Sequence, residues 1–222
     1  MAIKRVQWET FKSSLRWRQG EHLSILGATG GGKTHLALRL LPLRTYISFL
    51  ATKPRDDTIS RYCRKEHYEL IRKWPPSPRS DKVLLWPKFI KPGDEVNQAK
   101  VFYDAMMAMF VEGGWSVYVD EAYYFSKVLK FDAILRIYWT QARSNDVTLI
   151  ASTQRPRDVP LLMYDQATHL FFFRFRDKRD LDRLSEIGWL DGREIKENVA
   201  RLQLHEFLYV NNVSGDMVIS RA

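Results

Sequence analysis

The most informative stretch of this sequence reads Gly27-Ala28-Thr29-Gly30-Gly31-Gly32-Lys33-Thr34. It fits the pattern G-x-x-x-x-G-K-[ST] in full. The apolar segment His22–Leu26 precedes it and predicts a strand, and Lys33–Leu41 follows with the spacing of a helix. A strand directly before and a helix directly after are the context that this pattern requires. The chain is therefore predicted to carry a phosphate-binding loop.

Each residue type in this loop suits phosphate. Glycines let the backbone turn without Cβ clashes and aim consecutive N–H groups at phosphate oxygens. The helix that begins at Lys33 adds the positive end of its dipole. We expect Lys33 to reach the β- and γ-phosphates and the Thr34 hydroxyl to bind Mg²⁺. All eight residues are predicted to contact the nucleotide, which we take as ATP, although the sequence does not distinguish ATP from GTP.

A second part of the site is predicted at Asp120 and Glu121, which end the apolar strand Ser116–Val119. Burying two unpaired carboxylates is costly, whereas at the carboxyl end of a parallel sheet they face the ligand crevice. Asp120 is expected to hold Mg²⁺, and Glu121 to orient and deprotonate a water in line with the γ-phosphate. This pair favours nucleotide hydrolysis over phosphoryl transfer to a small acceptor.

A third strand is predicted at Thr148–Ser152, and Gln154 follows it. A polar residue at the tip of a strand beside the catalytic one is well placed to sense the γ-phosphate. We assign that role to Gln154.

The remaining chain alternates strand-like and helix-like segments. Further strands are expected at Thr45–Leu50, Val83–Trp86 and Leu170–Arg176, and helices at Asp57–Lys73, Asn97–Val111, Asp132–Ala142, Lys178–Ile187 and Arg193–Leu202. Continuous apolar strands are typical of parallel sheets buried on both faces. We predict an α/β fold with a central, mostly parallel sheet flanked by helices, and a small C-terminal hairpin formed by His205–Asn211 and Asp216–Arg221.

The chain is expected to be one domain, residues 1–222, with a basic N-terminal segment at 1–20 and a C-terminal helix and hairpin at 188–222. The proline-rich stretch Trp74–Ser80 is interpreted as a connection inside this domain, because neither side has enough elements for its own core.

The charge, hydropathy and cysteine content of the chain indicate which kinds of protein it can be. Lysine and arginine number 35 against 26 acidic residues, a net charge of +9, and this excess favours a polyanionic partner such as nucleic acid. The basic run Arg61–Lys73 could line a DNA channel or form a solvated helix face. No apolar run is long enough to predict a transmembrane helix. The single cysteine, Cys63, excludes an internal disulfide and is typical of a reducing, cytoplasmic setting.

Three elements together resemble the HerA/FtsK superfamily of RecA-like motor ATPases. They are the phosphate-binding loop, the sequence Tyr-Val-Asp-Glu-Ala at 118–122, and the segment from Gln141-Ala142-Arg143 to Gln154-Arg155-Pro156. The resemblance covers roughly residues 15–187, and its most specific part is Thr-Gln-Arg-Pro in this order after Asp-Glu. The chain looks most like the small DNA-packaging ATPases of viruses and phages. This implies a RecA-like P-loop NTPase fold of the ASCE type.

The resemblance also implies partners. Members form rings, often hexamers, that move double-stranded DNA, so we expect non-specific DNA binding, a homo-oligomeric ring and a capsid or membrane protein as anchor. It implies that Arg143 is an arginine finger acting on a neighbouring subunit. Arg155 and Arg157, which follow Gln154 closely in the sequence, are alternatives. Many relatives carry Asp-Pro-Lys after the second strand, whereas this chain has Thr52-Lys53-Pro54, so no role is assigned there.

The sequence leaves two other functions open. One is a filamentous-phage-type assembly or export ATPase, and the other is a slow nucleotide-binding switch or scaffold subunit without DNA translocation. For the favoured packaging motor we expect a location in the host cytoplasm or on the virion.

Overall fold

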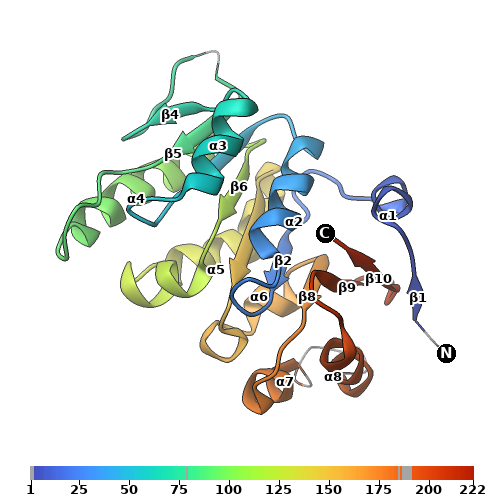
Figure 1. Cartoon of the computed structure of the whole chain (residues 1–222). Helices are drawn as coiled ribbons and strands as arrows, with labels where there is room; N and C mark the ends of the chain where they lie inside the picture. Colours follow the sequence, from blue (N-terminus) through green and yellow to red (C-terminus); the bar gives the residue numbers. More distant parts are fainter. Residues whose placement is uncertain (1–2, 79, 185, 187–191) are drawn as a thin grey trace.

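A computed structural model of the chain describes residues 3–78, 80–184, 186 and 192–222 (Figure 1). The strands in these residues are β1 (Lys4–Arg5), β2 (Leu23–Leu26), β3 (Ile47–Leu50), β4 (Glu69–Ile71), β5 (Lys82–Leu85), β6 (Ser116–Val119), β7 (Thr148–Thr153), β8 (His169–Phe173), β9 (Glu206–Asn211) and β10 (Met217–Arg221). Within the described residues they form one ten-stranded sheet in the order β1-β10-β9-β8-β2-β7-β6-β3-β5-β4. The strands from β8 to β4 all run parallel.

Helices cover both faces of this sheet (Figure 1). The helices on one face are α1 (Trp8–Ser14), α2 (Lys33–Leu40) and α3 (Asp57–Lys65). Those on the other face are α4 (Glu95–Glu112), α5 (Asp132–Gln141), α6 (Leu162–Asp165), α7 (Lys178–Leu184) and α8 (Gly192–Arg201). Strand β8 supplies both cores, because Phe171 and Phe173 pack on the first face while Leu170 and Phe172 pack on the second. The predicted α/β fold with a mostly parallel, helix-flanked sheet is confirmed.

The order of the central strands positions the site. Strand β7 lies between β2 and β6, with Leu26 beside Thr153 and Val119 beside Ala151. The carboxyl ends of parallel strands meet at one edge of a sheet. The loop after β2, the carboxylates after β6 and the residue after β7 therefore converge, which is the arrangement expected for the ASCE type.

One predicted helix is wrong. Asp57–Lys73 was expected to be helical throughout, but α3 ends at Lys65. The chain then turns through His67, which has a left-handed φ of 60°, and forms β4, which pairs in parallel with β5. Pairing with β5 outweighs the local helical pattern, because it satisfies backbone groups along the sheet edge. The basic run Arg61–Lys73 is consequently not one helix face.

The other predicted strands and helices are present, Ser116–Val119 with the predicted bounds and the rest with shifted ends. The strand expected to reach Arg176 ends at Phe173, and the helix expected to reach Ile187 is described as far as Leu184. Ile187, residues 188–191 of the predicted C-terminal segment and residues 1–2 of the basic segment lie outside the described residues. Strand β1 and helix α1, within the basic segment, were not predicted. None of the helices in the described part of the chain has the length and apolar character that crossing a membrane requires.

The C-terminal hairpin is confirmed, and it extends the main sheet. Strand β9 pairs antiparallel with β8, β10 pairs with β9, and β1 adds in parallel to β10. The side chain of Phe207 on β9 packs edge-on against Phe11 and against Phe171, with ring centroids 5.3 and 5.5 Å apart. The two ends of the chain are thereby brought together at one side of the sheet (Figure 1).

A buried histidine lies just before β2. His22 is 2% exposed, and its Nδ1 accepts a hydrogen bond of 3.0 Å from the Leu149 backbone N–H. The ring packs edge-on against Trp139. Burial, together with repulsion from Arg143, lowers the pKa of His22 from 6.5 to about 4. The folded protein therefore keeps this ring neutral at pH values where the unfolded chain protonates it.

This difference predicts a loss of stability in mild acid. Because the unfolded state binds more protons between pH 6.5 and about 4, the free energy of unfolding should fall as the pH drops through that window. Between pH 7.5 and 5 the His22 contribution amounts to about 2 kcal/mol. Urea unfolding at both pH values should show a smaller difference for His22→Gln, whose amide can accept the same hydrogen bond. An equal difference in both proteins would contradict the assignment.

Candidate functional site

The phosphate loop, residues 27–34, connects β2 to α2. Gly32 has a φ of 115°, which side chains with a Cβ rarely adopt. Gly27 lies so close to β8 that an added Cβ would come within 2.5 Å of the Phe173 Cβ. Gly32 is therefore required by its backbone conformation, and Gly27 by its close packing against the Phe173 side chain. The N–H groups of such a loop are the groups expected to bind a phosphate chain.

The lysine of the loop is folded over it. Lys33 Nζ donates to the carbonyl oxygen of Gly27 at 2.8 Å and to that of Ala28 at 3.1 Å. Burial lowers the pKa of Lys33, against the attraction of Glu121 and Asp120. The Lys33 ammonium now donates to neutral carbonyl oxygens. Hydrogen bonds to the negatively charged oxygens of a phosphate would be stronger, so phosphate should displace the carbonyls.

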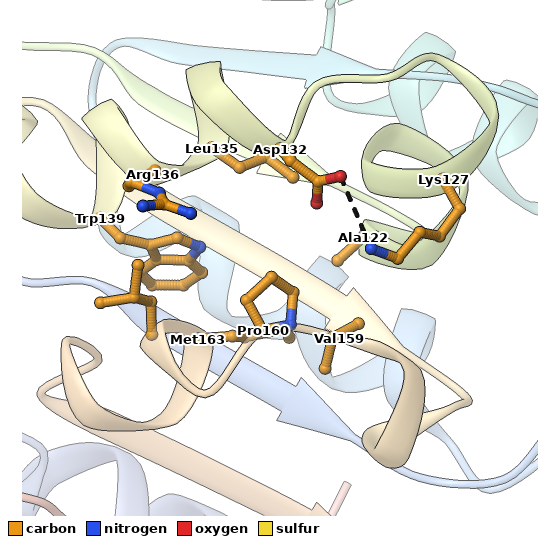
Figure 2. A pocket seen from close by; sticks show the side chains of 10 residues that line it. Ala122, Lys127, Asp132, Leu135, Arg136, Trp139, Val159, Pro160 and Met163 are labelled. Atoms are coloured by element: carbon orange, nitrogen blue, oxygen red, sulfur yellow. Dashed lines mark ion pairs between the residues drawn. The ribbon is translucent and has the colours of Figure 1, made fainter.

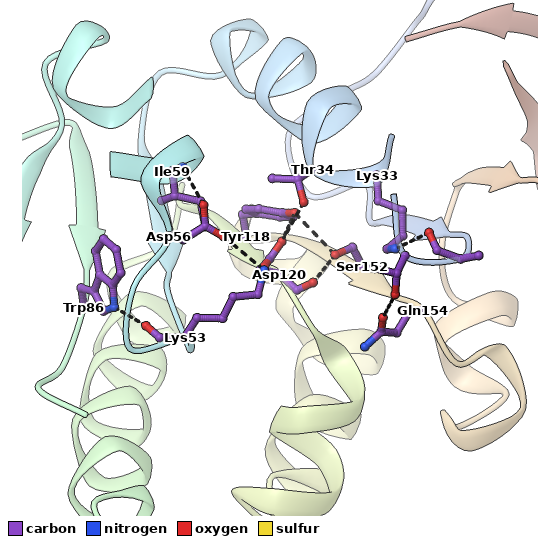
Figure 3. Close-up of polar contacts among 12 residues, drawn as sticks. Lys33, Thr34, Lys53, Asp56, Ile59, Trp86, Tyr118, Asp120, Ser152 and Gln154 are labelled. Atoms are coloured by element: carbon purple, nitrogen blue, oxygen red, sulfur yellow. Dashed lines mark hydrogen bonds and ion pairs between the residues drawn. The ribbon is translucent and has the colours of Figure 1, made fainter. Parts of the chain in front are cut away.

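Asp120 follows β6 and is 6% exposed. Its Oδ1 accepts hydrogen bonds from the Tyr118 hydroxyl at 2.9 Å and the Thr34 hydroxyl at 3.3 Å, and its backbone carbonyl accepts one from the Ser152 hydroxyl (Figure 3). A buried carboxylate beside a hydroxyl at the helix start provides the hard oxygen ligands that Mg²⁺ prefers. The two residues predicted to hold Mg²⁺ therefore lie together and fit that ion.

Glu121 is held in a defined orientation. Its Oε1 accepts a hydrogen bond of 2.9 Å from the Thr153 hydroxyl and a longer one, 3.4 Å, from the Tyr123 backbone N–H. Burial raises the pKa of Glu121, although these hydrogen bonds and the charge of Lys33 oppose the rise. A raised pKa makes the carboxylate a better proton acceptor, as a general base requires.

Gln154 lies at the tip of β7, as expected. Its side-chain oxygen accepts a hydrogen bond from the hydroxyl of Thr29 in the phosphate loop (Figure 3). The amide therefore faces the loop, where it can respond to a phosphate. Its role as a sensor remains a prediction.

These residues enclose one cavity of about 520 Å³. Its lining comprises Thr29, Gly30, Lys33, Thr34, Thr52, Lys53, Pro54, Phe89, Asp120, Glu121, Tyr124 and Gln154. Residues from three separate parts of the chain, each singled out by sequence, thus meet around a space large enough for the phosphate end of a nucleotide.

A second hollow, of about 500 Å³, opens on the other side of the phosphate loop. It is bounded by Arg174–Asp177 after β8 and by Gln203–His205 before β9, and Ala28–Gly31 separate it from the first cavity. Leu204 is 66% exposed there. An apolar side chain among polar groups suits a sugar and base, whose phosphates would extend across the loop toward Glu121.

A further pocket, of about 340 Å³, lies between α5 and the segment before α6 (Figure 2). Apolar side chains including Leu135, Trp139 and Met163 line most of it, and the Lys127–Asp132 ion pair of 3.5 Å lies at its side. The phosphate loop contributes nothing to its lining. The nucleotide site is therefore assigned to the phosphate-loop cavity and not to this pocket.

Arg143 lies far from its own phosphate loop. It is in the turn before β7, and its backbone and side chain contact Gly20, which precedes β2. Both contacts are at the amino ends of the strands, whereas the loop is at their carboxyl ends. Arg143 is exposed and forms no ion pair with Asp146 among the described residues.

The two alternative arginines are paired locally. Arg155 lies 3.8 Å from Asp158 and its guanidinium is 5.3 Å from the ring centroid of Tyr123. Arg157 lies 3.8 Å from Asp158 and 3.7 Å from Asp177. Their charges are therefore already partly neutralised within the chain.

Sequence reasoning missed three site residues. Thr153 orients Glu121, the Tyr118 hydroxyl supports Asp120, and Lys53 Nζ lies 3.3 Å from Asp120 Oδ2. Burial lowers the pKa of Lys53, but Asp120 and Asp56 outweigh this effect and raise it overall. Lys53 had a signal, since it is a charged residue three positions after the predicted strand Thr45–Leu50, whereas Tyr118 and Thr153 look like ordinary strand residues.

Comparisons with known proteins show which solved structures share this fold. No protein-family model matches the chain, and no curated protein matches its sequence. Among solved structures, the chain is similar to the genome packaging NTPase B204 from Sulfolobus turreted icosahedral virus 2 in complex with ATP-gammaS. The TM-score is 0.67 at 19% sequence identity, covering 91% of this chain and 98% of that one.

Two further structures come from other systems. VirB4 of Thermoanaerobacter pseudethanolicus has a TM-score of 0.70 at 13% identity, covering 89% of this chain and 88% of that one. The cytoplasmic domain of the Thermomonospora curvata type VII secretion ATPase EccC has a TM-score of 0.58 at 12% identity, covering 92% of this chain and 25% of that one. At these identities the likeness establishes the fold, and the predicted P-loop ATPase fold is confirmed.

Proposed function

We propose that this chain is an ATP-hydrolysing motor that translocates or packages double-stranded DNA, most simply for a virus or phage. The observation that carries the proposal is the meeting of Lys33, Asp120, Glu121 and Gln154 around one cavity. The fold shared with a viral genome packaging NTPase supports the DNA-moving role, and that structure's ATP-gammaS complex supports ATP as the nucleotide.

The residues divide the work of hydrolysis among them. The phosphate loop and Lys33 bind and orient the phosphate chain. Thr34 and Asp120 would hold Mg²⁺, which would supply positive charge beside the phosphates. Glu121, fixed by Thr153, accepts a proton from the attacking water.

The proposed partners follow from charge and fold. A net charge of +9 favours sequence-independent attraction to DNA phosphates. A homo-oligomeric ring, with a hexamer favoured, would place Arg143 of one subunit at the nucleotide of the next. A capsid or membrane protein would anchor the ring.

DNA should stimulate ATP turnover and bind in a salt-dependent manner. Because the attraction is electrostatic, log affinity should fall linearly with log salt, with a slope of about 0.9 per phosphate contact. The measurements are ATPase rates with and without duplex DNA, and DNA affinity between about 50 and 200 mM salt. Affinity that does not change with salt, or turnover that DNA leaves unchanged, would argue against a DNA motor.

An assembly or export ATPase is the second candidate, favoured by the VirB4 likeness, whose TM-score of 0.70 slightly exceeds that for the packaging enzyme. Such a protein would hydrolyse ATP at a rate that DNA does not change. A switch or scaffold subunit would bind ATP tightly and turn it over slowly under both conditions. The same ATPase measurement therefore separates all three.

A further inference from the structure

The proposed metal-binding carboxylate already has a cationic partner. Lys53 Nζ lies 3.3 Å from Asp120 Oδ2 and 3.2 Å from Asp56 Oδ2 (Figure 3). The other oxygen of Asp120, Oδ1, accepts the hydroxyl hydrogen bonds of Thr34 and Tyr118. Among the described residues Lys53 thus forms the one ion pair with Asp120, through Oδ2, while Oδ1 accepts from the two hydroxyls.

This ion pair differs from an ordinary surface pair. The side chain of Lys53 is 53% exposed, but that of Asp120 is only 5% exposed. Exposed pairs contribute little because water screens both charges. A carboxylate removed from water needs a partner, since a buried unpaired charge is costly.

The backbone that carries Lys53 is fixed by three elements. The Trp86 indole N–H donates to the Lys53 carbonyl at 2.7 Å (Figure 3). The Gln98 amide of α4 donates to the buried Thr52 carbonyl at 2.9 Å, and the Gln98 oxygen in turn accepts from the Tyr124 hydroxyl at 2.7 Å. On the other side Asp56 caps α3 through the Ile59 N–H. The backbone around Lys53 is therefore hydrogen-bonded to its neighbours, and the part of Lys53 that can change partners is its side chain.

We propose that Lys53 is a displaceable counter-ion of the metal site. It neutralises Asp120 when no nucleotide is bound and excludes divalent cations from it. The proposal rests on the proposed nucleotide-binding function. A cation that arrives with a nucleotide brings phosphate oxygens as additional ligands. The same phosphates offer the displaced ammonium a new anionic partner, because Lys53 and Lys33 line one cavity. Metal and nucleotide are therefore bound together and not one at a time.

The test is the binding of Mn²⁺, without nucleotide or DNA, followed by electron paramagnetic resonance. Removing the ammonium leaves Asp120 and Asp56 without their shared cation, so Lys53→Met should bind Mn²⁺ at least about tenfold more tightly than the unchanged protein. Lys53→Arg keeps the charge and should bind as weakly as the unchanged protein. Lys127→Met, which breaks the exposed ion pair with Asp132, is the matched control and should show no gain.

Folding is checked by circular dichroism, and Lys53→Gln serves as a second neutral variant if Lys53→Met fails to fold. Equal Mn²⁺ affinity in the folded neutral variant and the unchanged protein would overturn the proposal, as would an equal gain in Lys127→Met. The assay contains no nucleotide, so its outcome is separate from that of the proposed function. If Lys53→Met bound Mn²⁺ more tightly but the unchanged protein hydrolysed no ATP, the counter-ion role of Lys53 would be supported and the motor function would be excluded.

Discussion

Replacing Glu121 by glutamine should stop ATP hydrolysis and leave ATP binding intact. Glutamine keeps the size of the side chain and can still accept the Thr153 hydrogen bond, but it cannot take a proton from water. General-base catalysis contributes roughly 10²–10⁴-fold in rate, so turnover should fall by that amount. ATP binding, measured with a fluorescent analogue, should stay near that of the unchanged protein.

Two further variants make this result specific. Lys33→Ala should lose tight nucleotide binding itself, because its ammonium is the charge that the phosphate loop carries. Glu112→Gln removes an exposed carboxylate at the end of α4 and should change neither binding nor turnover. If Glu121→Gln hydrolysed ATP at the normal rate, the assignment of the general base would fall.

The central part of the site could be predicted because its residues are local in sequence. A glycine-rich loop between a strand and a helix predicts where phosphate binds. Two carboxylates after a buried strand predict the residues on the other side of the nucleotide cavity. Because β7 pairs in parallel with β2 and β6, Gln154 at its carboxyl end lies at the same edge of the sheet. Each of these patterns can be recognised in the sequence without knowledge of the tertiary structure.

The residues that were missed depend on contacts between distant segments. Thr153 matters because β7 lies beside β6, and Lys53 matters because the loop after β3 is tied to Trp86 and Gln98. The wrong helix at Asp57–Lys73 has the same origin, since β4 exists only by pairing with β5. Helix α1 has a short apolar face, Trp8 and Phe11, that gains its stability from packing against β9.

Arg143 should act on the nucleotide of a neighbouring subunit. It precedes β7 at the amino edge of the sheet, and the six residues of β7 span roughly 20 Å, so the phosphate loop of its own chain is out of reach. It is exposed and forms no ion pair among the described residues, so its guanidinium is accessible to a partner subunit. A guanidinium that reaches a transferring phosphoryl group is worth roughly 10³–10⁵ in rate, and Arg143→Ala should lose that much turnover.

Mixing separates action between subunits from action within one. Arg143→Ala and Lys33→Ala should each be inactive alone, because every interface then lacks either the finger or the phosphate-binding lysine. In mixed rings some interfaces join an intact Lys33 to an intact Arg143, so activity should return as the two variants are combined. Arg136→Ala, an exposed arginine of α5 two turns earlier, should be active alone and serves as the control. If activity did not return at any ratio, in rings shown to exchange subunits, Arg143 would not act on a neighbouring subunit. Normal turnover by Arg143→Ala alone would show that Arg143 has no role in hydrolysis.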